Sequence, residues 1–180
     1  MGFENINLWF AKDDNDITVL AKDITKDIKH NNYKCPICGS SVIPRTGEIK
    51  TWHFAHRDAS KCSTESFIHF WVKHELLKIG DTFKVKINNE VKEYICKELL
   101  IEQKYETSYG TYKPDLTIIT DNDETLYIEV AQTNKKKIKD FIKMWNELNN
   151  TVIEITTGEV SDGNKIECMN AIWYDGYDVS

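Results

Sequence analysis

The chain has 180 residues, enough for one domain of ordinary size or for one domain with a small metal-stabilised module. Hydrophobic residues make up 41% and aromatic residues 11%, which is enough to fill a core and argues against global disorder. No apolar run approaches the roughly 20 residues of a membrane-spanning helix, and the N-terminus lacks the basic region of a signal peptide. We therefore expect a cytoplasmic protein with no membrane partner.

The formal net charge is −6, which argues against an indiscriminate nucleic-acid binder, but the charge is unevenly distributed. From Glu147 onward there are seven acids and one base, so residues 1–146 sum to zero. The segment 30–63 has five bases and two acids, and the segment 135–143 has five lysines and one aspartate. Locally basic surfaces of this kind can bind phosphate.

The pattern of apolar residues predicts alternating strands and helices. Short strands are expected at 5–10 and 17–20, joined by an acidic turn, and a cysteine/histidine module follows at 33–62. A helix is expected over about 64–79, with Ser63 as its N-cap. The later elements are a hairpin at 83–96, strands at 98–105, 113–119 and 125–131, a helix at 135–149, a strand at 151–157 and an apolar tail at 171–174.

This order predicts an α/β fold, a mixed sheet flanked by helices. The final strand–helix–strand segment implies a right-handed crossover to a parallel neighbour.

The cysteine/histidine module contains five candidate zinc ligands for four places: Cys35, Cys38, His53, His56 and Cys62. Cys35 and Cys38 form a C-P-x-C-G knuckle, which points two sulfurs at one ion. The segment between the knuckle and His53 is expected to form a hairpin around Thr46-Gly47 that returns the chain to the knuckle.

The identity of the remaining zinc ligands stays open at this point. On an extended strand His53 and His56 face opposite sides, which favours only one of them unless the chain turns there. We expect the zinc to be structural, because a segment with so few aliphatic residues needs a metal to hold it. A catalytic zinc is the alternative, whereas a redox C-x-x-C would need a strand-to-helix context that the sequence does not provide here.

Acidic residues at strand ends predict a second metal site. If residues 115–119 and 125–131 form a hairpin, Asp115 and Glu129 meet at its open end. Paired carboxylates of this kind hold Mg²⁺ or Mn²⁺ for phosphodiester hydrolysis. Glu102 on the preceding strand is a third acid. The same spacing also fits an Asp115 that caps a strand and a Glu129 that pairs with a lysine.

Two further features belong to this prediction. The lysine expected two residues after Glu129 is replaced by Ala131, so Gln132 or Lys135 is the candidate for the polar group beside the metal. In the helix at 64–79, Glu65, His69 and Lys73 are spaced i, i+4, i+8 and share one face. That face either lines an active site or is a solvated surface with ordinary ion pairing.

Taken together and in order, these residues resemble the competence protein CoiA-like family. The segments that carry the resemblance are Tyr33-Lys34-Cys35-Pro36-Ile37-Cys38-Gly39, Trp52-His53-Phe54-Ala55-His56, Cys62, Glu65-Ser66 with His69 and Lys73, Lys113-Pro114-Asp115 and Ile128-Glu129. The family is similar to zinc fingers in its N-terminal part and to PD-(D/E)xK restriction endonucleases in the remainder. The resemblance thus implies a zinc-finger-like, zinc-ribbon-like module at 1–63 and a nuclease-like domain at 64–180.

By the same resemblance, Asp115 and Glu129 would be the ligands of the catalytic metal, and His69 and Lys73 would belong to the active-site helix. Two positions depart from the family pattern: Ile68 replaces an acid and Ala131 replaces a glutamine. Glu65 or Glu102 would supply the missing acid, and Gln132 or Lys135 the missing polar group.

Three functions are compatible with these expectations. The first is a Mg²⁺- or Mn²⁺-dependent nuclease acting on single- or double-stranded DNA in DNA processing or recombination, with Zn²⁺ as a structural cofactor. The second is a DNA-binding adaptor that keeps the fold but has lost catalysis. The third is a protein-interaction module that uses the zinc module or the acidic tail from Glu147 onward.

Overall fold

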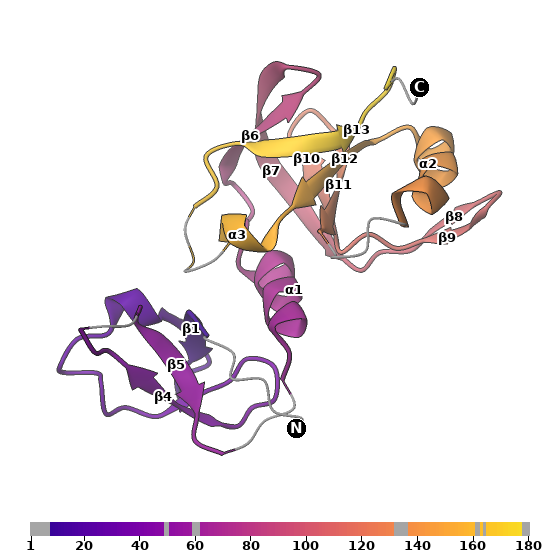
Figure 1. The fold of residues 1–180 in the computed structure, drawn as a ribbon. Helices are drawn as coiled ribbons and strands as arrows, with labels where there is room; N and C mark the ends of the chain where they lie inside the picture. Colours follow the sequence, from indigo (N-terminus) through magenta and orange to yellow (C-terminus); the bar gives the residue numbers. More distant parts are fainter. Residues whose placement is uncertain are drawn as a thin grey trace. The chain divides into compact units, whose positions relative to one another are not determined.

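The structure, a computed structural model, describes residues 8–48, 51–58, 62–131, 137–160, 163 and 165–177, without the side chains of 64, 65 and 137–140. The chain forms two units, one of Met1–Trp71 with Val160–Asn164 and the other of Val72–Glu159 with Lys165–Ser180 (Figure 1). The boundary between them falls inside helix α1 (Thr64–His74).

The first unit contains an antiparallel sheet with the strand order β2-β1-β3-β4-β5. Its elements are β1 (Phe10–Lys12), β2 (Thr18–Leu20), the 3-10 turn η1 (Ala21–Asp23), β3 (Tyr33–Lys34), β4 (Ser41–Arg45) and β5 (His53–His56). The predicted N-terminal hairpin is confirmed, because Phe10 pairs with Leu20 and Lys12 with Thr18. Its first strand begins at Phe10 rather than at residue 5, and residues 5–7 lie outside the described part of the chain.

Aromatic side chains form the core of this unit. The Phe67 ring stacks on Phe10 at a centroid distance of 4.5 Å and meets the edge of Trp9 at 4.4 Å. The predicted N-cap of α1 is confirmed, because the Ser66 N–H donates to Ser63 Oγ at 3.0 Å. The helix ends at His74 rather than at residue 79, and the chain turns again at Gly80 (φ +95°) before the next strand.

The second unit is a closed barrel of six strands in the order β10-β11-β12-β13-β6-β7 (Figure 1). Its elements are β6 (Thr82–Ile87), β7 (Glu90–Ile101), β8 (Tyr105–Thr107), β9 (Gly110–Tyr112), β10 (Leu116–Thr120), β11 (Thr125–Val130), α2 (Lys137–Leu148), β12 (Thr151–Ile155), α3 (Thr157–Val160) and β13 (Met169–Trp173). The mixed α/β class is confirmed, whereas closure into a barrel is not something that the sequence predicts.

Strand β7 accounts for this closure. It runs without a break from Glu90 to Ile101, where the sequence predicts two strands. Its first half pairs with β6 and its second half with β10, so one strand belongs to both sides of the ring. The small β8–β9 hairpin between β7 and β10 is also absent from the sequence-based expectation.

The predicted crossover through α2 is confirmed, because β11 and β12 are parallel neighbours. Helix α2 spans Lys137–Leu148, close to the predicted range, and its apolar stripe packs on the outside of the barrel. The buried cluster at this face consists of Tyr112, Tyr127, Met144, Trp145, Val152 and Trp173. This packing fixes the ends of β10 and β11, where the predicted carboxylates lie.

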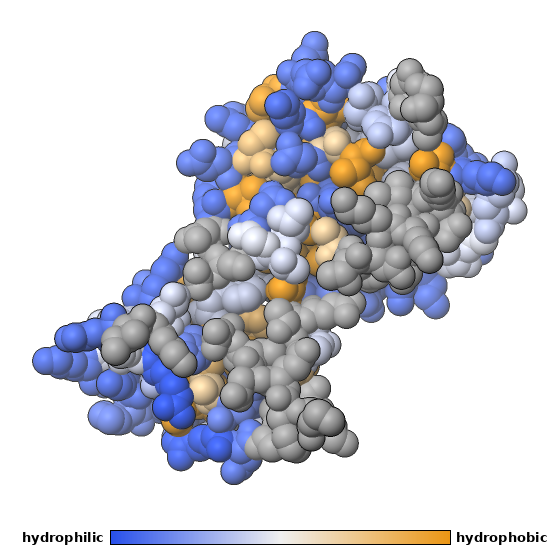
Figure 2. Space-filling model, in the orientation of Figure 1, coloured by the Kyte–Doolittle hydropathy of each residue, from blue (hydrophilic) through white to orange (hydrophobic). Residues whose placement is uncertain are grey.

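The surface seen in Figure 2 is mostly hydrophilic, with apolar residues in patches between charged ones. Ile79 and Val91 are among the large apolar side chains that are more than half exposed, at 70% and 58%. Among the described residues, no helix has the length and apolar character needed to cross a membrane.

Candidate zinc site and carboxylate row

The knuckle that follows β3 is a tight turn closed by backbone hydrogen bonds. The Gly39 N–H donates to the Cys35 carbonyl at 2.9 Å, and the Cys35 N–H donates to the Ser40 carbonyl at 2.8 Å. Gly39 has φ +73°, a conformation that a side chain would disfavour. The glycine of the C-P-x-C-G pattern is therefore what allows both thiols to point to one place.

The β4–β5 hairpin brings one histidine to this knuckle. Val42 of β4 pairs with His56, and Arg45 pairs with His53. The His53 ring lies beside the residues that precede β5, with Nδ1 at 2.9 Å from the Thr51 carbonyl oxygen. The His56 ring instead places Nε2 at 3.5 Å from Cys38 Sγ. The alternation of β5 thus separates the two histidines, as the sequence predicts for an extended strand.

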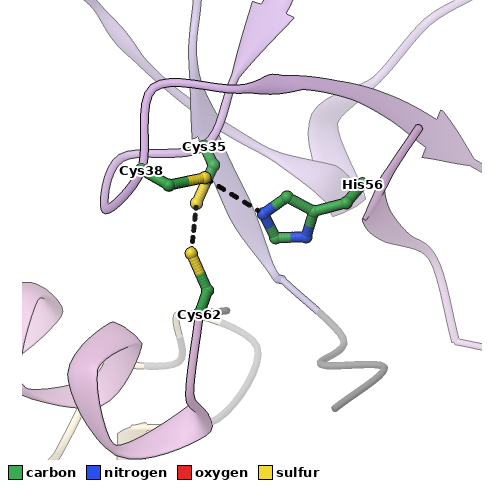
Figure 3. A group of neighbouring side chains, drawn as sticks. All are labelled: Cys35, Cys38, His56 and Cys62. Atoms are coloured by element: carbon green, nitrogen blue, oxygen red, sulfur yellow. Dashed lines mark hydrogen bonds between the residues drawn. The ribbon is translucent and has the colours of Figure 1, made fainter. Parts of the chain in front are cut away.

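Cys35, Cys38, His56 and Cys62 form a candidate metal site, called here the zinc cluster, in which the four possible ligand atoms lie within 4.8 Å of one another (Figure 3). The Cys35 and Cys62 sulfurs are 3.7 Å apart. A tetrahedral zinc with bonds of about 2.3 Å to sulfur and about 2.0 Å to nitrogen has edges of about 3.8 Å (S–S) and about 3.5 Å (S–N). The observed separations therefore fit a zinc ion, and the four residues could bind one.

The charges of the thiols point in the same direction. Burial raises the pKa of Cys35 to about 12, and the neighbouring Cys38 and Cys62 add to this rise. For Cys38, burial opposes ionisation, but hydrogen bonds from Ser40, Cys62 and His56 outweigh it and lower its pKa to about 6. Several thiolates at such short distances repel one another, and a bound zinc ion would supply the positive charge that offsets this repulsion.

The second candidate site is a row of four acids on neighbouring strands of the barrel, called here the carboxylate row: Glu102, Asp115, Glu129 and Glu154. Leu116 pairs with Ile101 on one side and with Ile128 on the other, so the preceding residue, Asp115, lies between Glu102 and Glu129. Glu129 pairs directly with Glu154 across the parallel strands. Residues paired across strands project to one face, so Asp115, Glu129 and Glu154 share a face.

Backbone and side-chain bonds fix the two central acids. Asp115 Oδ2 accepts the Val130 N–H at 3.0 Å, which ties the carboxylate of one strand to the backbone of the next. Glu129 Oε1 accepts the Tyr112 hydroxyl at 2.6 Å. Both carboxylates are half-buried at the end of the β10–β11 hairpin, as the predicted hairpin implies. With Glu102 they do not form a group of three ligands as tight as the zinc cluster, which is the one such group among the described residues.

Glu102 is engaged by the predicted active-site helix. Lys73 Nζ lies 2.5 Å from Glu102 Oε1, and this hydrogen bond and charge hold the pKa of the carboxyl below its usual range. Lys113 lowers the same pKa further, and the negative Asp115 opposes this effect. The sequence predicts Lys73 and Glu102 as separate site residues, whereas the structure joins them as an ion pair.

The other predicted site residues are less well placed. Gln132 and Lys135 lie outside the described residues, and so does the side chain of Glu65. His69 is half-buried in α1 and belongs to the first unit, whereas the carboxylate row belongs to the second.

Two residues of this site are missing from the sequence-based prediction. Glu154 could have been found, because Ile153-Glu154 repeats the Ile128-Glu129 pair and the two strands are adjacent across the crossover. Tyr112 carries no such signal, since its contact with Glu129 depends on how the β8–β9 hairpin folds back.

The comparison with known proteins concerns the N-terminal part. Residues 18–65 match the family model described as the N-terminal domain of competence protein CoiA. This segment contains the whole zinc cluster, and the match confirms the predicted resemblance for this part of the chain. Among curated proteins, none matches the chain.

Proposed function

We propose that this chain, a CoiA-like protein by its N-terminal segment, is a metal-dependent DNA nuclease whose active site is the carboxylate row. The observation that carries the proposal is the position of Asp115 and Glu129, side by side at the open end of the β10–β11 hairpin. The crossover through α2 to the parallel strand β12 is compatible with the restriction-endonuclease-like fold that the resemblance implies. In this proposal the zinc cluster is structural and holds the first unit together.

The charges of the carboxylate row suggest which acids hold the catalytic ion. Lys73 pairs with Glu102, while Asp115 accepts the Val130 N–H and Glu129 accepts the Tyr112 hydroxyl. Half-buried carboxylates at paired positions of neighbouring strands repel one another, and a cation bound among them relieves this repulsion. Mg²⁺ or Mn²⁺ prefers oxygen ligands, and when bound would supply Lewis acidity toward the scissile phosphate and the attacking water. Asp115 and Glu129 would hold it, with Glu154 beside them.

The remaining residues would bind and orient the DNA. Lys113 is exposed two residues before Asp115, and Lys143 is exposed on α2. Ammonium groups around an acidic centre hold phosphate oxygens and make binding depend on salt. Gln132 or Lys135 would orient water or stabilise the charge that develops on the phosphate.

A nuclease assay with single- and double-stranded DNA tests this proposal in the presence of Mg²⁺ or Mn²⁺. Asp115→Asn and Glu129→Gln keep the shape of the side chains and remove the charges. We expect each to lower the cleavage rate by at least about 100-fold. The control is Asp121→Asn, which removes an exposed acid from the turn at the opposite end of the same hairpin and should cleave at the normal rate. Cleavage that survives both site variants would contradict the proposal.

The assay must distinguish the effect of zinc from the effect of the catalytic ion. EDTA removes both metals, so its effect alone does not locate the active site. Adding Zn²⁺ back without Mg²⁺ or Mn²⁺ should restore the fold of the first unit but not cleavage. Cleavage with Zn²⁺ alone would instead favour a catalytic zinc.

A DNA-binding adaptor without catalysis is the second candidate. The observation that favours it is Ala131. Its N–H donates to the Ile155 carbonyl at 2.7 Å, and its side chain has no polar group. This candidate predicts that the wild type shifts DNA at low salt and leaves it uncut with either ion. If the wild type neither binds nor cuts DNA, a protein partner of the zinc module or the acidic tail becomes the better explanation.

A further inference from the structure

Tyr112 is the neighbour of the carboxylate row that is most firmly held by the core. Its side chain is 1% exposed, and its ring meets Tyr127 edge-on at 5.3 Å and Phe141 at 5.8 Å. Trp145 of α2 packs on the same cluster, with a centroid distance of 6.4 Å from the Tyr112 ring. A ring surrounded in this way has little freedom to change rotamer, so the position of its hydroxyl is set by the core.

The hydroxyl of this fixed ring is directed at Glu129. Its oxygen lies 2.6 Å from Glu129 Oε1, within the range of a hydrogen bond from a hydroxyl to a charged carboxylate. A hydroxyl has a single proton to donate, and in this geometry Tyr112 donates it to Glu129. The Glu129 carboxylate thus has a donor fixed by the core on one of its two oxygens.

The segment that carries Tyr112 also carries Asp115. Only Lys113 and Pro114 separate the two residues, and Pro114 is buried with its φ fixed by the ring. Asp115 is in turn bonded to the Val130 N–H, next to Glu129. The two central acids are thus linked twice, once through the backbone of β11 and once through Tyr112.

From this geometry we propose that Tyr112 is a positioning residue: its hydroxyl holds the Glu129 carboxylate in the orientation in which, together with Asp115, it binds the divalent ion. This inference rests on the proposed function, because it requires a metal at Asp115 and Glu129. Groups that orient a metal ligand by a hydrogen bond commonly change metal affinity by about 10- to 100-fold when they are removed.

Tyr112→Phe tests the role, since it removes one oxygen and keeps the ring. The matched control is Tyr127→Phe: Tyr127 is equally buried in the same cluster, and its hydroxyl accepts from Asn150 Nδ2 at 3.0 Å rather than donating to Glu129. The measurement is the affinity for Mn²⁺ without DNA, by electron paramagnetic resonance on zinc-loaded protein. We expect Tyr112→Phe to weaken Mn²⁺ binding by about 10-fold or more, and Tyr127→Phe to leave it within about twofold.

A double-mutant cycle separates positioning from a general loss of structure. In the Glu129→Gln background the hydroxyl has no charged carboxylate to orient, so Tyr112→Phe should no longer change the Mn²⁺ affinity. An equal loss in both backgrounds would overturn the inference, and so would an unchanged affinity in the single variant. If the wild type itself shows no Mn²⁺ binding that depends on Glu129, the proposed metal site fails and takes this inference with it, an outcome distinct from the failure of Tyr112 alone.

Discussion

The ion pair between Lys73 and Glu102 distinguishes one acid of the carboxylate row from the others. Glu102 lies 2.5 Å from the Lys73 ammonium, and this pairing lowers its availability to a metal. The side chains are 17% and 47% exposed, so the pair contributes at most about 1 kcal/mol to stability. The main effect of the pair is therefore on the charge of the carboxylate row, and its effect on the stability of the fold is small.

The pair has a defined pH dependence. The pKa of Glu102 is lowered in the folded protein, so the contribution to stability is present above the ordinary carboxyl value of about 4.3 and is lost as the pH falls through the lowered pKa. We expect Lys73→Met to move the pKa of Glu102 upward, toward the ordinary value, in a carbon-13 NMR titration of the carboxyl group. Lys113→Met should produce a smaller rise in the same direction, because its effect on Glu102 ranks below that of Lys73. An unchanged pKa in Lys73→Met would show that the contact does not persist in solution.

At the scale of elements, strand β5 determines the composition of the zinc cluster. The strand contains only His53–His56, yet its pleat sends its two histidines to opposite faces. Pairing with β4 fixes this register, since Val42 and Arg45 lie opposite His56 and His53. Which histidine joins the zinc cluster therefore depends on how β5 pairs with β4, and not on the H-x-x-H spacing itself.

Two alanine variants in β5 separate these roles. His56→Ala should lower the zinc content of the purified protein, because it removes one of the four ligands of the cluster. His53→Ala should keep one zinc per chain, since the His53 ring lies against the Thr51 carbonyl. Zinc per chain is measured by elemental mass spectrometry after dialysis against a weak chelator. Loss of zinc from both variants to the same extent would show that β5 is not extended at the metal site.

At the scale of the whole molecule, the two units differ in their strands and in their buried cores. The first has short strands and a small aromatic core, and its four candidate zinc ligands come from separate parts of the segment 35–62. The second has a closed barrel and a helix packed on a large buried cluster. Small modules with little apolar burial depend on a metal, whereas a barrel with its own core does not.

Zinc removal is therefore expected to act on one unit. In hydrogen exchange followed by mass spectrometry, a zinc chelator should raise exchange in β3, β4 and β5, and leave exchange in β10, β11 and β12 unchanged. Added Zn²⁺ should restore the protection of the first unit. Equal loss of protection in both units would mean that the barrel depends on the zinc module for its stability.

The sequence predicts those features that depend on neighbouring residues. The knuckle at Cys35, the N-cap Ser63, the apolar stripe of α2 and the hairpin that pairs Asp115 with Glu129 all follow from short-range patterns. Closure of the barrel, the unbroken strand β7 and the contact from Tyr112 to Glu129 join segments distant in sequence. No periodicity encodes such pairings, because a strand has the same alternation whichever neighbour it takes.

Barrel closure also has a consequence for folding during synthesis on the ribosome. Strand β6 ends at Ile87, but β13, the parallel partner that seals it, begins only at Met169. During synthesis β6 and β12 therefore present unpaired edges for as long as the intervening chain is being made, and unpaired edges invite pairing with other nascent chains. Strand β6 has two lysines, Lys84 and Lys86. Repulsion between these charges on the β6 strands of two nascent chains opposes their pairing, and so delays aggregation until β13 has been synthesised.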